Sequence, residues 1–149
     1  AAASNLDLYQ VNCTYYAALG EHENEYLIAR ALQFFAPGVP QVYYTGLLAG
    51  SNDMALLTKT GVGRDINRAY YRSADIDDAL ERPVVQQLIA LIRLRNEHPA
   101  FDGSFTLDLA DNQLTLSWAN SDARLELTLD CLARKARITD QTGAELFVL

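Results

Sequence analysis

The segment Gln41–Leu48 (QVYYTGLL) constrains the fold of this sequence more than any other. It is almost continuously apolar, rich in aromatic and β-branched residues, and bounded by Pro40 and by a turn that contains Gly50. A short apolar run of this kind is typical of a strand buried on both faces, and such strands usually belong to parallel sheets. The sequence therefore predicts an α/β unit in which this segment is a strand covered by helices.

Two longer segments have the apolar spacing of helices. Residues Glu23–Phe35 begin with acidic side chains, keep their apolar side chains on one side and stop before Pro37, as an amphipathic helix does. Residues Pro83–Asn96 have proline in the first turn and apolar residues at the helical repeat, and Pro99 follows them. We expect a helix in each segment.

Shorter elements lie between these two helices. We expect a short helix over Asn52–Lys59, capped by Ser51 or Asn52, and a short acidic helix capped by Ser73. The intervening residues 60–71 are rich in glycine, arginine and asparagine and have no clear period. Such a stretch is typical of an ordered functional loop.

The composition of the chain changes near Phe101. Beyond it, only short segments with alternating apolar and polar residues appear, separated by turn-forming residues. They are FTLDL, LTLSW, LELTL, KARIT and ELFVL, which begin at Phe105, Leu114, Leu125, Lys135 and Glu145. The pattern predicts a small antiparallel β-domain of about five strands over residues 101–149.

The α/β part is too small to be complete by itself. A buried parallel strand needs neighbours on both edges and helices over both faces, yet besides Gln41–Leu48 we expect at most one more strand, near Leu8–Val11. A closed barrel of such units takes roughly 250 residues. We therefore expect residues 1–100 to be the tail of a larger α/β domain, and a chain that opens on Ala1 without an initiator Met favours an internal cut.

Charge and cysteine usage bear on the partners of the chain. The formal net charge is −7, and an acidic surface repels both nucleic-acid phosphates and anionic lipids. No apolar run approaches the ~20 residues that span a bilayer. Cys13 and Cys131 accompany no Cys-x-x-Cys or Cys/His cluster, so we expect two buried thiols rather than a disulfide or a metal site. These features favour a cytoplasmic protein with no cofactor, metal, nucleic acid or membrane as partner.

Several long segments together resemble one known family. They are SNLDLYQVNCTYYAALG (Ser4–Gly20), FFAPGVPQVYYTGLLAGSND (Phe34–Asp53), GVGRDINRAYY (Gly61–Tyr71) and ERPVVQQLIALIRLRNEHPAFDG (from Glu81). Together they resemble the last third of bacterial sucrose phosphorylases, which belong to the α-amylase clan. The resemblance implies a (β/α)8 catalytic barrel, with residues 1–100 as its C-terminal part and Gln41–Leu48 as its eighth strand. It also implies that residues 101–149 form a small antiparallel β-domain.

The resemblance implies a retaining transfer of glucose from sucrose to inorganic phosphate, which gives glucose 1-phosphate and fructose. In such reactions one carboxylate attacks the anomeric carbon while a second carboxyl group protonates the leaving sugar. In the family these carboxylates lie on earlier barrel strands, before Ala1. We therefore expect no catalytic residue in this chain, no turnover by the chain alone, and completion by the missing N-terminal part of the barrel. The complete protein could also form a homodimer.

The resemblance assigns substrate binding to Asp7, Leu8, Tyr9 and Gln10, in a mobile acceptor loop, and to Arg64, at the donor subsite. A carboxylate such as that of Asp7 accepts hydrogen bonds from fructose hydroxyls, whereas phosphate needs donors such as the Tyr9 hydroxyl. The resemblance implies a loop that turns Asp7 toward fructose and Tyr9 toward phosphate. The planar guanidinium of Arg64 suits a carboxylate and a sugar hydroxyl held at fixed angles.

Each of these residues also has a structural interpretation. Asp7 could cap a turn, Tyr9 could pack on the surface, and Arg64 could form an ion pair with Asp65. Gly61 and Gly63 are interpreted as turn geometry that lets Arg64 approach rather than as a phosphate cradle. His22 and His98 are expected to be surface or capping residues, and Trp118 is expected to pack within the β-domain.

Three positions depart from the pattern of the family. They are Ala17, Thr45 and Ala69. A buried Thr45 would need a backbone partner for its hydroxyl. Ala17 and Ala69 leave the acceptor specificity open, so the chain could come from a related phosphorylase that uses sucrose 6′-phosphate, glucosylglycerol or glucosylglycerate. Two other classes also remain as alternatives, namely a non-catalytic carbohydrate-binding or scaffolding module centred on the β-domain, and a hydrolase of the same clan.

Overall fold

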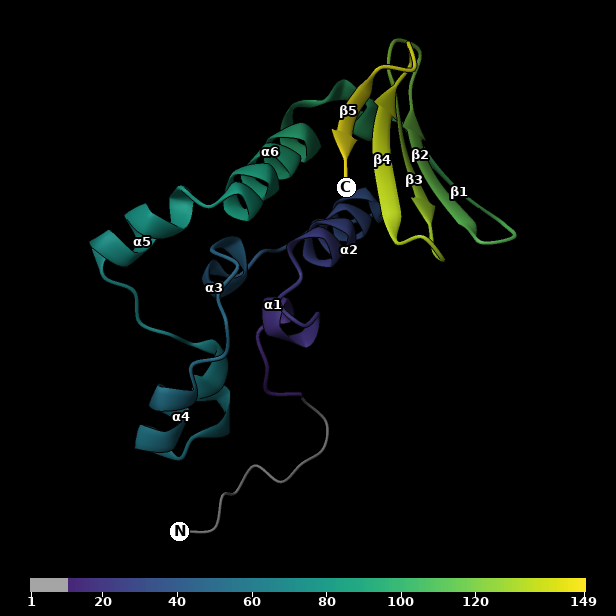
Figure 1. Ribbon diagram of the computed structural model, residues 1–149. Helices are drawn as coiled ribbons and strands as arrows, with labels where there is room; N and C mark the ends of the chain where they lie inside the picture. The colour runs from purple at the N-terminus through teal and green to yellow at the C-terminus, as the bar shows by residue number, and fades with distance from the viewer. Residues whose placement is uncertain (1–10) are drawn as a thin grey trace. The chain divides into compact units, whose positions relative to one another are not determined.

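A computed structural model describes residues 11–149 of the chain (Figure 1). Helices come first and strands follow. The helices are α1 (Tyr15–Ala18), α2 (Glu23–Phe35), α3 (Tyr44–Leu47), α4 (Met54–Thr60), the 3-10 helix η1 (Gly63–Asn67), α5 (Ser73–Leu80), α6 (Pro83–Glu97) and the 3-10 helix η2 (Pro99–Asp102). The strands are β1 (Ser104–Ala110), β2 (Gln113–Ala119), β3 (Arg124–Asp130), β4 (Lys135–Asp140) and β5 (Glu145–Val148).

These elements form two compact units. The part of the first unit that the structure describes comprises residues 11–26 and 42–86. The second unit comprises Leu27–Gln41 and Gln87–Leu149. Helices α2 and α6 therefore contribute residues to both units.

The second unit contains a five-stranded antiparallel sheet in the order β1-β2-β3-β4-β5. The strands are consecutive in the chain, so every connection is a hairpin turn. In the register, Leu116 pairs with Leu127 and Leu127 with Ile138, which aligns the apolar residues of neighbouring strands on one face. The five predicted strands and their antiparallel arrangement are confirmed.

One face of this sheet carries the core of the second unit. Leu125, Leu127 and Ile138 are fully buried, because alternate residues of a strand point to the same face. Trp118 is also buried, and its Nε1 donates a hydrogen bond of 2.7 Å to the carbonyl oxygen of Phe35 in α2. The expected packing role of Trp118 is thus confirmed.

The core of the first unit is built around Tyr26, which is fully buried. The ring of Tyr26 packs edge-to-face on that of Tyr16, with centroids 5.2 Å apart, and its hydroxyl donates to the carbonyl oxygen of Gly46 in α3. The guanidinium of Arg82 donates to the carbonyl oxygens of Leu48 and Ala49, at 3.2 and 3.1 Å. The C-terminal end of α3 is thus held by side chains from α2 and from the residues after α5.

The prediction of a buried strand over Gln41–Leu48 is wrong. Gln41–Tyr43 belongs to no regular element, although Tyr43 is extended (φ −73°, ψ 153°), and Tyr44–Leu47 is helical. Tyr43 and Tyr44 are 56% and 39% exposed, whereas a strand covered on both faces would bury both. Periodicity alone does not distinguish a short buried strand from a helical turn. A strand also needs ladder partners, and the strands among residues 11–149 all pair within the C-terminal sheet.

The two predicted long helices, α2 and α6, are confirmed. The two predicted short helices, α4 and α5, are also confirmed, but their N-cap residues differ from the predicted ones. Helix α4 is capped by Asp53, whose Oδ1 accepts from the backbone N–H of Leu56 at 2.8 Å. Ser51 and Asn52 are therefore not the cap. Helix α5 begins at Ser73 with Arg72 at the N-cap position, so Ser73 is the first helical residue rather than the cap.

The histidine and cysteine predictions have mixed outcomes. His22 is exposed, and His98 caps η2 by accepting from the backbone N–H of Ala100 at 3.3 Å. Both cysteines are free, as expected, but Cys13 is half-buried and Cys131 is exposed. The expectation of two buried thiols is wrong because Cys131 lies in the turn between β3 and β4. Among residues 11–149, no helix is long and apolar enough to cross a membrane.

Replacing Leu127 by Ala tests the assignment of the buried face of the sheet. Leu127 is 0% exposed, so Leu127→Ala should leave a cavity and lower the free energy of unfolding by about 2–5 kcal/mol. The matched control is Leu107→Ala in edge strand β1, where the leucine is 59% exposed and the loss should be less than about 1 kcal/mol. Urea denaturation followed by the fluorescence of Trp118 measures both. Equal losses would contradict the assignment.

Candidate functional site

Four of the five predicted substrate-binding residues, Asp7, Leu8, Tyr9 and Gln10, lie outside the described residues 11–149. The fifth, Arg64, lies in η1 and its side chain is exposed. The structure therefore describes the surroundings of one predicted binding residue, together with the residues that directly follow the predicted acceptor loop.

The turn that carries Arg64 depends on two glycines. Gly61 ends α4 with φ +65°, a left-handed conformation that favours glycine. Gly63 begins η1, and a Cβ placed there would lie only 2.9 Å from Nδ2 of Asn12. A larger residue at position 63 would have to displace Asn12. Both glycines thus shape the turn, as the Gly-x-Gly interpretation predicts.

Three separate segments anchor η1 and the residues after it. The backbone N–H of Asp53 donates to the carbonyl oxygen of Ile66 at 2.7 Å. The Thr45 hydroxyl donates to the carbonyl oxygen of Asn67 at 3.3 Å, which is the backbone partner that a threonine at this position was expected to need. Further contacts are Asn67 Nδ2 to the Cys13 carbonyl (3.4 Å) and the Tyr44 hydroxyl to the Ala69 carbonyl (3.0 Å). The predicted ordered loop over residues 60–71 is therefore held by specific hydrogen bonds.

Arg64 itself forms no ion pair among residues 11–149. The ion pairs there join Arg72 to Asp75, Arg82 to Glu23 and Arg124 to Glu126. The alternative interpretation of Arg64, an ion pair with Asp65, therefore has no support in the geometry. Among residues 11–149, the exposed guanidinium of Arg64 thus has N–H donors available for a ligand.

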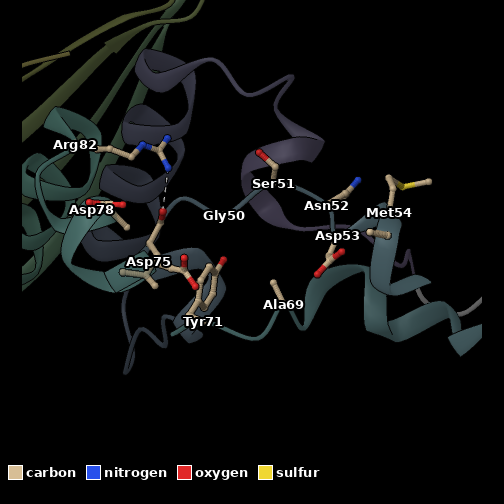
Figure 2. Close-up of a pocket in the computed structure, with 13 residues that line it drawn as sticks. Gly50, Ser51, Asn52, Asp53, Met54, Ala69, Tyr71, Asp75, Asp78 and Arg82 are labelled. Carbon is tan, nitrogen blue, oxygen red and sulfur yellow. Dashed lines mark hydrogen bonds between the residues drawn. The ribbon is translucent and has the colours of Figure 1, made fainter. Parts of the chain in front are cut away.

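An open pocket of about 660 Å³ lies in the first unit (Figure 2). Its lining comes from the segment that joins α3 to α4, from Ala69 and Tyr71, and from α5 with the residues that follow it. The lining residues are Leu48, Gly50, Ser51, Asn52, Asp53, Met54, Ala55, Ala69, Tyr71, Asp75, Asp78, Ala79 and Arg82. Sequence reasoning did not identify this pocket, because its residues are dispersed over 35 positions of the chain.

Most polar groups of this pocket already have structural partners. Burial raises the pKa of Tyr71, with a further rise from nearby Asp53 and an opposing effect of Arg82. A Cβ at Gly50 would overlap the Tyr71 hydroxyl, so Gly50 is needed for this close packing. Asp53 caps α4 and Arg82 holds the carbonyl oxygens at the end of α3. These side chains stabilise the backbone around the pocket rather than form a pair for acid–base catalysis.

Asp75 is also engaged at the start of a helix. Its carboxylate accepts hydrogen bonds from the backbone N–H and the guanidinium of Arg72, at 2.8 to 3.1 Å. These bonds lower the pKa of Asp75 to about 2, so at neutral pH the group carries no proton to donate. Within residues 11–149, no group of three or more His, Cys, Asp or Glu side chains is arranged to hold a metal ion.

Known proteins with a similar sequence or backbone indicate the class of protein to which this chain is related. No family model matches the chain. Its backbone is similar to the crystal structure of sucrose 6F-phosphate phosphorylase from Thermoanaerobacter thermosaccharolyticum, with a TM-score of 0.88 and 44% sequence identity. The match covers 94% of this chain and 29% of that one. The chain is thus related to the glucosyl phosphorylases.

Sequence comparison identifies more similar relatives of this chain. The chain is 61% identical to the sucrose phosphorylase of Agrobacterium vitis over 93% of its length, and 57% identical to that of Bifidobacterium adolescentis over 87%. It is therefore homologous to the sucrose phosphorylases over most of its length, which confirms the resemblance predicted from the sequence. The chain spans 29% and 26% of the length of these two relatives.

Removing the guanidinium of Arg72 tests the cause of the Asp75 pKa. In Arg72→Gln the carboxyl pKa should rise from about 2 toward its ordinary value of 3.8, because the side-chain bonds of Arg72 are lost. Since the pKa of Asp75 is lowered in the folded state, its stabilising effect is fully present above pH 3.8 and is lost as the pH falls through about 2. Carboxyl ¹³C NMR titration measures the midpoint. The control Arg93→Gln, at another exposed arginine, should leave the titration midpoint of Asp75 unchanged. The same midpoint in both variants would exclude Arg72 as the cause of the lowered pKa.

Proposed function

We propose that this chain is part of a sucrose phosphorylase, which in its complete form transfers glucose from sucrose to inorganic phosphate and releases fructose. The observation that carries this proposal is the 61% and 57% identity to two sucrose phosphorylases over most of the chain. Because the chain spans less than a third of either relative, the activity belongs to the complete protein. The chain alone should show no turnover.

We assign residues 1–100 to the C-terminal part of a (β/α)8 barrel and residues 101–149 to a small antiparallel β-domain. The position of the sheet supports this boundary, since all strands among residues 11–149 begin at or after Ser104. The greater length of the relatives leaves room for the remaining barrel elements, which this proposal places in the part of the protein before residue 1.

In this proposal the reaction passes through a covalent glucosyl intermediate. A carboxylate from the missing part of the barrel attacks the anomeric carbon of glucose, and a second carboxyl group there protonates fructose as it leaves. Phosphate then attacks the same carbon and releases the carboxylate. The residues of this chain bind and orient the sugars and the phosphate.

Arg64 is assigned to the donor side of the site. Its exposed guanidinium, free of ion pairs among residues 11–149, and its anchored turn support this role. A fixed guanidinium holds a carboxylate and a glucosyl hydroxyl at defined angles, which a lysine ammonium does less well.

The residues Asp7, Leu8, Tyr9 and Gln10 are assigned to the acceptor side. Fructose and phosphate must bind at this acceptor side one after the other. Fructose hydroxyls can donate to an acceptor in the protein, whereas phosphate needs hydrogen-bond donors. The Asp7 carboxylate is the proposed acceptor for fructose, and Tyr9 and Gln10 are the proposed donors to phosphate. A loop that presents one set and then the other would serve both acceptors.

A chimeric enzyme tests the proposed function directly. The matching segment of the Agrobacterium vitis relative, 29% of its length, is replaced by this chain. The chimera should form glucose 1-phosphate from sucrose and phosphate, whereas the relative without the segment and the chain alone should not. Activity on sucrose 6′-phosphate in place of sucrose would instead favour the related phosphorylase. If neither sucrose nor sucrose 6′-phosphate yielded glucose 1-phosphate, the proposal would be contradicted.

Replacing Arg64 by Lys in the chimera tests the donor assignment. Arg64→Lys keeps the charge but loses the planar pair of donors, so kcat/KM for sucrose should fall roughly 10- to 100-fold. Arg68→Lys is the matched control, since Arg68 is exposed and follows the same turn. Initial rates of glucose 1-phosphate formation measure both, and equal rates in the two variants would remove the assignment of Arg64.

Replacing Tyr9 by Phe tests the acceptor assignment. Tyr9→Phe removes one donor to phosphate, so the KM for phosphate should rise roughly 10-fold, while hydrolysis of sucrose without phosphate should change little. Tyr70→Phe is the control, because Tyr70 is 85% exposed. An unchanged KM for phosphate in Tyr9→Phe would contradict the role of its hydroxyl.

A further inference from the structure

The segment Asn12–Thr14, which directly follows the predicted acceptor loop, runs along the turn that carries Arg64. At one end of η1, Asn12 packs so closely on Gly63 that a Cβ there would lie 2.9 Å from its Nδ2. At the other end, Asn67 Nδ2 donates to the carbonyl oxygen of Cys13 at 3.4 Å. The segment thus lies close to one end of the turn and is hydrogen-bonded to the other.

Another asparagine, Asn52, also binds this segment. Asn52 Oδ1 accepts from the backbone N–H of Thr14 at 2.8 Å, and Asn52 Nδ2 donates to Sγ of Cys13 at 3.5 Å. The next residue, Asp53, uses its backbone N–H to bind the carbonyl oxygen of Ile66 in η1. Two consecutive residues thus bind both the segment and the turn.

We propose that Asn52 and Asn67 are positioning residues that fix the end of the acceptor loop relative to Arg64. This inference rests on the proposed function, because it assumes that the acceptor loop and Arg64 serve the same reaction. Neither asparagine needs to touch a substrate. The phosphate held by the loop must lie in line with the glucosyl carbon held near Arg64, and a displacement of about 1 Å can reduce a rate roughly 100-fold.

The amide side chain suits this task because it carries a donor and an acceptor on a short stem. Asn52 uses both, for the N–H of Thr14 and for Sγ of Cys13. Aspartate at position 52 would keep the acceptor and lose the donor, whereas alanine would lose both. Asn52→Asp is therefore a graded, conservative variant.

The two thiols of the chain allow a test that does not depend on activity. Cys13 is half-buried within the proposed contacts, and Cys131 is exposed in another unit and serves as an internal standard. In the isolated chain, Asn52→Ala and Asn67→Ala should each raise the maleimide labelling rate of Cys13 relative to Cys131 at least about fivefold. Asn96→Ala, at an exposed asparagine of α6, should leave the ratio unchanged. An unchanged ratio in both test variants would overturn the inference.

The chimera tests the consequence for the reaction. A displaced acceptor loop should impair attack by phosphate more than attack by water, so the ratio of glucose 1-phosphate to free glucose should fall roughly tenfold in Asn52→Ala and Asn67→Ala. A loss of folded protein would reduce both products equally and leave this ratio unchanged. Asn52→Asp should retain a ratio between those of the parent and Asn52→Ala, and Asn96→Ala should match the parent.

The outcomes separate this inference from the proposed function. If the parent chimera makes glucose 1-phosphate and the product ratio is the same in all variants, the positioning role is overturned and the proposed function stands. If the parent chimera makes none from sucrose, the proposed function is overturned and the positioning role falls with it, whatever the labelling rates show.

Discussion

The first unit depends on side chains that bind backbone groups. Buried backbone N–H and C=O groups need partners, and in residues 11–26 and 42–86 no strand ladder supplies them. Asn52, Asn67, Thr45 and Arg82 supply hydrogen bonds instead, each to a backbone group of a distant segment. These bonds anchor α3 and the Arg64 turn, so the proposed site depends on them.

The second unit is stabilised in a different way. Its backbone groups pair in a regular five-stranded sheet, and its apolar side chains align across the strands to form one buried face. The hydrogen bond from Trp118 to the carbonyl oxygen of Phe35 joins the sheet to α2.

The two units satisfy their backbone hydrogen-bonding groups in different ways. Regular helices and a sheet satisfy most of the backbone, and side-chain hydrogen bonds satisfy the irregular parts around the Arg64 turn. In the proposed reaction the chemical steps belong to carboxylates elsewhere in the complete protein. In the same proposal, this chain contributes the guanidinium of Arg64 and the acceptor loop, which bind and orient the substrates.

The sequence by itself determined the elements whose patterns are local and long. The apolar spacing of Glu23–Phe35 repeats often enough to define a helix, and the alternation in the five C-terminal segments repeats often enough to define strands. Long sequence segments such as Phe34–Asp53 were sufficient to indicate the homology to sucrose phosphorylases. Tertiary structure alone decided the conformation of Gln41–Leu48, the use of Asp53 rather than Asn52 as a helix cap, and the pocket of the first unit. A short apolar run fits either a strand or a helical turn, and an asparagine can cap a helix or bind a distant backbone. The choice depends on which partners the rest of the fold brings within hydrogen-bonding distance, and Thr14 and Cys13, which Asn52 binds, are nearly 40 positions away in the sequence.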